Sequence, residues 1–117
     1  MAQQKVDIGI SDGDGFRVLR PAGDLDVYTV GSLRDALGQM IEEETPKVVV
    51  DLDQVPFMDS SGLGALMGGV RRLREAGGDL AIACTREQHL KLFTITGFGE
   101  GVSIAPTVEE AAQGFRD

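Results

Sequence analysis

The sequence is poor in the residues that build metal and redox sites. Its 117 residues include a single cysteine, Cys84, and a single histidine, His89. A zinc site usually takes four ligands, mainly cysteine and histidine, so we expect no metal and no cofactor. Cys84 ends an apolar run and has only Arg86 as a basic neighbour, which predicts a buried, unreactive thiol in a reducing cytosol. His89 is interpreted as a surface or boundary residue rather than a catalyst.

Long apolar runs and an excess of positive charge are also absent. No apolar segment approaches the ~18 residues of a membrane span, and residues 1–5 lack the apolar core of a signal peptide. The 11 basic and 19 acidic residues give a net charge of -8, which disfavours nucleic acid and anionic membranes as partners. With 42% hydrophobic residues, we expect one cytoplasmic domain over residues 1–117 with a single core.

The apolar residues recur with the periods of strands and helices. A hairpin is expected from Val6–Ile10 and Phe16–Arg20, with Pro21 fraying the second strand or placing it at an edge. Further strands are expected at Lys47–Leu52, at Asp79–Cys84 and around Val102–Ile104. Helices are expected from Val30 to Met40, from about Ser61 to Glu75, from a capping box at Thr85 to Gly97, and from a capping box at Thr107 toward Phe115. This order predicts an α/β fold with a four- or five-stranded mixed sheet and about four helices.

The segment Phe57–Gly64 connects an apolar strand to a helix and is the most informative part of the chain. We expect Ser60 or Ser61 at the helix N-cap, where a hydroxyl accepts hydrogen bonds from the free N–H groups of the first turn. The same N-terminus carries about half a positive charge, so it also favours a phosphate. The residues alone leave open whether a serine here is a cap, a phosphorylation site, or both.

Glycines are unusually frequent in the helix after these serines, although each mid-helix glycine costs roughly 1 kcal/mol relative to alanine. At ~100° per residue, one side of the helix should carry Leu63, Leu66, Met67, Val70 and Leu73. Tight packing on the sheet explains Gly62 and Gly69. Gly64 and Gly68 should face away from the core together with Arg72, and a bare glycine stripe there indicates a surface that another protein approaches closely.

Three acids, Asp24, Asp26 and Asp59, lie in loops that should meet at one edge of the sheet. This edge is the usual functional end of a parallel α/β sheet, although solvated loop acids or N-caps explain them equally well. We interpret Asp51 and Asp53 as acids at the end of a strand, and the sequence implies no partner for either. Arg71, Arg72 and Arg74 are explained by their place on the solvated flank and in the last turn of a helix, and they need no special function.

Enzyme motifs are missing. Met58–Gly62 lacks the first glycine of a G-x-S-x-G elbow, and the spacing from Gly62 to Gly69 fits neither a dinucleotide loop nor a Walker loop. No pair of acids is placed for acid–base chemistry. We therefore expect a protein that is not an enzyme.

Three motifs, Gly23–Asp26, Asp59–Gly64 and Phe93–Gly97, occur in this order along the chain. Together they resemble the STAS-domain anti-sigma factor antagonists of bacteria, and the similarity extends over nearly the whole chain. The resemblance implies a STAS-like domain with helices mainly on one face of the sheet. Pro21 and Phe98–Gly99 depart from the family pattern without touching the serine motif.

The resemblance also implies a partner-switching function. In that family the antagonist binds an anti-sigma factor that is also a serine kinase, which frees the sigma factor. The kinase then phosphorylates the first hydroxyl residue after the motif aspartate, which is Ser60 here, and a PP2C-type phosphatase restores the active form. The resemblance also implies that Asp24, Asp26 and Asp59 lie beside this serine and help to form the docking surface. Together with Ser60, Ser61, Gly62, Gly64, Gly68 and Arg72 they make up the partner-binding surface that we expect.

Two alternatives stay open. One is a STAS scaffold that is never phosphorylated. The other is a receiver domain phosphorylated on aspartate, in which Asp24 and Asp26 would imitate the acidic pair. No lysine follows Lys91, so the late lysine that receivers need is missing.

Overall fold

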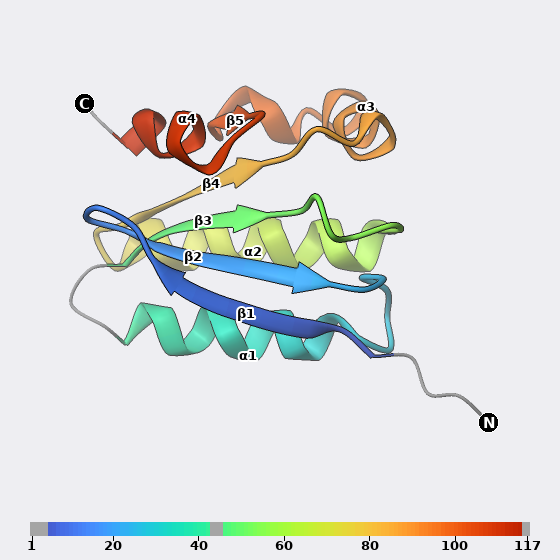
Figure 1. Cartoon of the computed structure of the whole chain (residues 1–117), viewed down its shortest axis with the longest axis horizontal. Helices are drawn as coiled ribbons and strands as arrows, with labels where there is room; N and C mark the ends of the chain where they lie inside the picture. Colours follow the sequence, from blue (N-terminus) through green and yellow to red (C-terminus); the bar gives the residue numbers. More distant parts are fainter. Residues whose placement is uncertain (1–4, 43–45, 116–117) are drawn as a thin grey trace.

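The computed structural model describes residues 5–42 and 46–115, which form a five-stranded sheet flanked by helices (Figure 1). The expected domain ends at residues 1 and 117 lie outside the described residues. In chain order the elements are β1 (Asp7–Asp12), β2 (Arg17–Ala22), α1 (Val30–Ile41), β3 (Lys47–Asp51), α2 (Ser60–Glu75), β4 (Asp79–Ala83), α3 (Glu87–Thr96), the 3₁₀ turn η1 (Phe98–Glu100), β5 (Ile104–Ala105), α4 (Val108–Ala112) and the 3₁₀ turn η2 (Gln113–Phe115). The α/β order predicted from periodicity is confirmed.

The strands follow their order in the chain across the sheet, from β1 at one edge to β5 at the other. β1 pairs with β2 antiparallel, and the remaining neighbours pair parallel. Pro21 lies opposite Ile8 of β1, beyond the last β2–β3 pair at Leu19 and Val50. Proline has no N–H for a second ladder, so β2 continues past Leu19 beside β1 alone.

Two apolar clusters lie on opposite faces of the sheet. The larger is formed with α1 and α2, which lie behind the sheet in Figure 1, and it also takes in Phe93 of α3. Phe93 contacts Phe98 with ring centroids 5.1 Å apart. The smaller cluster is formed by Val18, Val49, Ala81, Ala83, Val108 and Ala111, under α4. The helices therefore lie mainly on one face, as the family resemblance implies.

Helix ends show where local patterns succeed and fail. The predicted helix start at Thr107 is confirmed, because the Thr107 hydroxyl oxygen accepts a hydrogen bond from the Glu110 amide at 3.1 Å. The Glu110 carboxylate accepts from the same hydroxyl at 3.0 Å, which is not the backbone contact of a full capping box. Gly97 ends α3 in the left-handed region, with φ 76°. The Thr85 capping box is wrong. α3 begins after Arg86, without a side-chain cap, because the Thr85 hydroxyl donates to Asp53 instead.

Two predicted exposures are also wrong. Met67 was expected on the buried side of α2 but is 50% exposed, because the core-facing stripe passes through Leu63, Leu66 and Val70. His89 was expected at the surface but is 1% exposed, because its ring nitrogen Nε2 bonds the buried Val55 carbonyl. In the part of the chain that the structure describes, no helix combines the length and apolarity needed to cross a bilayer.

Candidate functional site

Two loops at the carboxyl end of the sheet are joined by backbone pairing. Leu25 and Met58 form a parallel bridge outside the named strands. The Leu25 amide donates to the Phe57 carbonyl at 2.9 Å, and the Asp59 amide donates to the Leu25 carbonyl at 3.2 Å. The sequence-predicted acids Asp24, Asp26 and Asp59 are therefore brought together at one end of the sheet.

The start of α2 differs from the prediction in one respect. Asp59, not a serine, is the N-cap: its Oδ1 atom accepts hydrogen bonds from the amides of Ser61 at 2.8 Å and Gly62 at 3.4 Å. An acid at this position satisfies free N–H groups and complements the helix dipole. Ser60 is the first residue of the helix and is exposed, whereas Ser61 is half-buried. The N-cap role predicted for Ser60 or Ser61 is therefore wrong.

Asp26 also organises its own loop. Its Oδ1 atom accepts hydrogen bonds from the amides of Tyr28 at 2.9 Å and Thr29 at 3.2 Å. The buried Thr29 hydroxyl donates to the Asp24 carbonyl at 2.7 Å. The N-cap interpretation is confirmed for Asp59. Asp26 does not cap α1, whose N-cap is Thr29, and its carboxylate instead accepts from the amides of the turn before that helix.

The four α2 glycines divide as the helical period predicts. A Cβ at Gly62 would lie 2.6 Å from Met58 Cγ, and one at Gly69 would lie 2.9 Å from Leu37 Cδ1. A Cβ at Gly64 or Gly68 would meet no atom within 4 Å. Gly62 and Gly69 therefore permit close packing, whereas Gly64 and Gly68 leave a shallow open strip on α2 between Ser60 and the exposed Arg72.

Sequence reasoning missed the apolar side chains near this end of the sheet. Tyr28 is 82% exposed, Val27 65% and Phe57 50%, and Met67 lies on the exposed side of α2. Val27 and Tyr28 follow the Leu25 bridge, and Phe57 precedes Met58. For Val27, Tyr28 and Phe57 the available signal was a large apolar residue inside a polar loop, whereas Met67 lies within α2. We call these four residues, Val27, Tyr28, Phe57 and Met67, the apolar patch.

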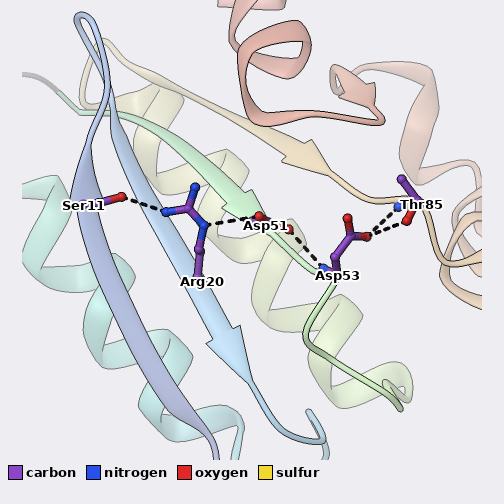
Figure 2. Close-up of polar contacts among 5 residues, drawn as sticks. All are labelled: Ser11, Arg20, Asp51, Asp53 and Thr85. Carbon is purple, nitrogen blue, oxygen red and sulfur yellow. Dashed lines mark hydrogen bonds and ion pairs between the residues drawn. The ribbon is translucent and has the colours of Figure 1, made fainter.

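Asp51 and Asp53, for which the sequence implied no partner, both bond other residues (Figure 2). Arg20 Nε lies 3.3 Å from Asp51 Oδ2, and Arg20 Nη1 donates to the Ser11 hydroxyl at 2.8 Å. Asp51 Oδ1 accepts from the Asp53 amide at 3.1 Å. Asp53 Oδ1 then accepts from the amide and the hydroxyl of Thr85, at 2.7 and 3.0 Å. These contacts connect β1, β2, β3 and the segment that precedes α3.

Cys84 is buried, as predicted, at 2% exposure. Burial raises the pKa of its thiol, and the nearby carboxylates of Asp53 and Asp51 act in the same direction. A thiol with a raised pKa is a weak nucleophile at neutral pH. Within residues 5–42 and 46–115, no three histidine, cysteine or acidic side chains are grouped closely enough to hold a metal ion.

Comparisons with known proteins agree with this architecture. The model of the STAS domain family matches residues 7–111. An anti-sigma-B factor antagonist of Staphylococcus epidermidis is 40% identical over 84 residues, which span 72% of this chain and 78% of that protein. An anti-sigma factor antagonist structure from Mycobacterium paratuberculosis is 26% identical with a TM-score of 0.79, over 96% of this chain and 95% of that one. The phosphorylated form of the Bacillus cell fate determinant SpoIIAA is 26% identical with a TM-score of 0.71, over 94% of this chain and 100% of that one. The chain therefore belongs to the STAS domain family.

Proposed function

We propose that this chain is an anti-sigma factor antagonist. It binds an anti-sigma factor that is also a serine kinase and thereby frees a sigma factor. Phosphorylation of Ser60 ends the binding, and a PP2C-type phosphatase restores it. Relatives 37–40% identical to this chain bear the name anti-sigma-B factor antagonist, which supports the binding activity. Membership of the STAS family sets the receiver alternative aside.

The observation that carries the proposal is the position of Ser60. It is exposed on the first turn of α2, directly after the Asp59 cap, at the end of the loop that pairs with Leu25. A kinase needs an accessible hydroxyl on a defined backbone, and Ser60 has both. Ser61 is the second choice, because it is half-buried and its amide is already bonded to Asp59.

The docking surface that we propose surrounds this serine. It consists of the predicted residues Asp24, Asp26, Asp59, Ser60, Ser61, Gly64, Gly68 and Arg72, extended by the apolar patch. The predicted residue Gly62 is left out, because it is buried against Met58. In a well-packed interface a few residues contribute most of the binding energy, and tyrosine is one of the residue types enriched among them. The open positions beside Gly64 and Gly68 allow a partner to approach the α2 backbone. Asp26 and Asp59 contribute by shaping the two loops, because their carboxylates accept backbone hydrogen bonds.

A phosphate on Ser60 would act on the surface rather than on the fold. It adds about -1.5 to -2 charges and three acceptor oxygens. The Asp59 carboxylate already accepts from the first free amides of α2, so the phosphate would extend toward the partner as added bulk and negative charge. We expect binding to fall while the domain stays folded.

The test uses the purified anti-sigma factor of the same organism, with ATP. Mass spectrometry should find phosphate on Ser60, and the phosphorylated protein should bind the anti-sigma factor more weakly. A PP2C-type phosphatase should restore binding. Tight binding without any phosphorylation would instead support a STAS scaffold that is never modified.

A further inference from the structure

The loop between β3 and α2, residues 52–59, contains Phe57 and ends one residue before Ser60. On one side it pairs with the loop before α1: the Gly23 amide donates to the Gln54 carbonyl at 3.1 Å, and Leu25 pairs with Met58. The loop therefore depends on contacts with distant segments for its shape, since it has little regular structure of its own.

On its other side the loop is bonded to the start of α3 by three side chains. Gln88 Nε2 donates to the Pro56 carbonyl at 2.6 Å, and His89 Nε2 lies 2.6 Å from the Val55 carbonyl oxygen. Arg86 Nε donates to the Asp53 carbonyl at 3.0 Å. The side chains of Arg86, Gln88 and His89 thus bond three of the four carbonyls between residues 53 and 56. We call these three residues the α3 clamp.

The α3 clamp is fixed to the core. His89 and Val55 are buried, at 1% and 0% exposure, and Phe93 of the same helix packs against Phe98. A buried carbonyl that loses its donor is strongly unfavourable, so the His89 contact holds Val55 in one place. The loop can shift relative to α3 only if these buried contacts break.

The base of the loop is held as well (Figure 2). Asp53 accepts two hydrogen bonds from Thr85, and its own amide donates to Asp51, which pairs with Arg20. The residues before Val55 are therefore tied both to the sheet and to the segment that opens α3. Val55 and Pro56, immediately before Phe57, are different: in the part of the chain that the structure describes, the only side chains that bond them come from α3.

We propose that Gln88 and His89 are positioning residues for partner binding. By fixing the carbonyls of Pro56 and Val55, they set the path of Phe57 and of the residues that lead to Ser60. This inference rests on the proposed function. It states that α3, a helix outside the docking surface, influences how tightly the docking surface around Ser60 binds the anti-sigma factor. Neither side chain needs to touch the anti-sigma factor for this effect.

Gln88 offers the cleaner variants, because it is exposed and its loss should not unfold the protein. Gln88→Met keeps the length of the side chain and removes the donor, and Gln88→Glu also replaces it with an acceptor. Gln113→Met and Gln113→Glu make the same changes at an exposed residue of η2. Without the hydrogen bond from Gln88, the partner must order the loop when it binds. If that ordering costs the free energy of one hydrogen bond, the affinity falls about five- to tenfold.

The experiment measures two quantities for each variant. The first is amide hydrogen exchange in the free protein at Leu25, Asp59 and Ser61, whose amides donate to Phe57, Leu25 and Asp59 respectively. The second is affinity for the purified anti-sigma factor of the same organism. Both Gln88 variants should exchange at least threefold faster at these amides and bind about five- to tenfold more weakly. The Gln113 variants should match the wild type in both.

His89 provides the rescue. His89→Gln retains a donor toward Val55 and should keep more affinity than His89→Leu, which removes it. Weaker binding of the Gln88 variants with unchanged exchange would mean direct contact with the partner, and would overturn the inference. Faster exchange with unchanged affinity would overturn it too. If the wild type does not bind the anti-sigma factor, the proposed function itself fails, whereas equal binding by all variants would refute only the positioning role.

Discussion

The Asp59 carboxylate accepts a hydrogen bond from the amide of Ser61, 2.8 Å away, and leaves the side chain of Ser60 exposed between them in the chain. The N-cap of α2 and the serine that we propose as the phosphorylation site are therefore different residues. This separation allows Ser60 to be replaced or modified without removing the cap of α2.

The first prediction concerns the stability of α2. Asp59→Ala should lower the free energy of unfolding by about 1 kcal/mol, because two amides lose their acceptor. Ser60→Ala should change it by no more than about 0.5 kcal/mol, since Ser60 is exposed and is not the cap. Urea denaturation of both variants measures the difference. A larger loss for Ser60→Ala than for Asp59→Ala would contradict the assignment of the cap.

The second prediction separates the open glycines from the packed ones. Gly64→Ala and Gly68→Ala should stabilise the protein, by up to about 1 kcal/mol each, because alanine favours the helix and their Cβ atoms meet open space. Gly64→Leu should keep the fold and weaken binding to the anti-sigma factor. Gly69→Leu should destabilise the protein, because the new side chain meets Leu37 and Leu80. Unfolding by Gly64→Leu would refute the proposed open strip.

The third prediction tests the apolar patch. Tyr28→Ala and Phe57→Ala should each weaken binding to the anti-sigma factor by about 30-fold, the effect of losing a central aromatic contact. Their melting temperatures should stay close to that of the wild type, since both side chains are at least half exposed. Ile10→Ala is the matched control, because Ile10 is 45% exposed on the edge strand β1. An equal loss of affinity from Ile10→Ala would argue against a localised interface.

The fourth prediction follows from Cys84. Burial raises the pKa of its thiol in the folded protein, so above the ordinary thiol pKa of about 8.5 the unfolded chain loses this proton first. The contribution of Cys84 to stability is therefore complete below that pH and is lost as pH rises toward the folded value. Unfolding free energies between pH 7 and pH 10 should fall more steeply for the wild type than for Cys84→Ala. Parallel curves would show that the thiol titrates alike in both states.

The order of elements and the apolar faces of the helices were predictable, because they depend on periodic burial that the sequence displays directly. The division of the α2 glycines followed from the same periodicity. Contacts between distant segments were not predictable in this way. The Leu25–Met58 bridge places the predicted acids together, yet neither residue carries a local signal for pairing with the other.

The interpretations of Thr85, Asp53 and His89 were overturned for one shared physical reason. Thr85 was expected to cap α3, and Asp53 was expected to have no partner, but the two residues, 32 positions apart, bond each other. His89 was expected at the surface or at its boundary, whereas the Val55 carbonyl supplies a buried partner for its ring. In each case a tertiary hydrogen bond replaced the local preference.

The most direct test of the account is the site and consequence of phosphorylation. The purified protein is incubated with the anti-sigma factor of the same organism and ATP, analysed by mass spectrometry, and its affinity for the anti-sigma factor is measured beside that of Ser60→Asp and Ser60→Asn. We predict phosphate on Ser60, retained folding in every form, and weaker binding by the phosphorylated protein and by Ser60→Asp than by Ser60→Asn. Phosphate found only on Ser61, or a Ser60→Asp variant that binds as tightly as the wild type, would contradict the mechanism.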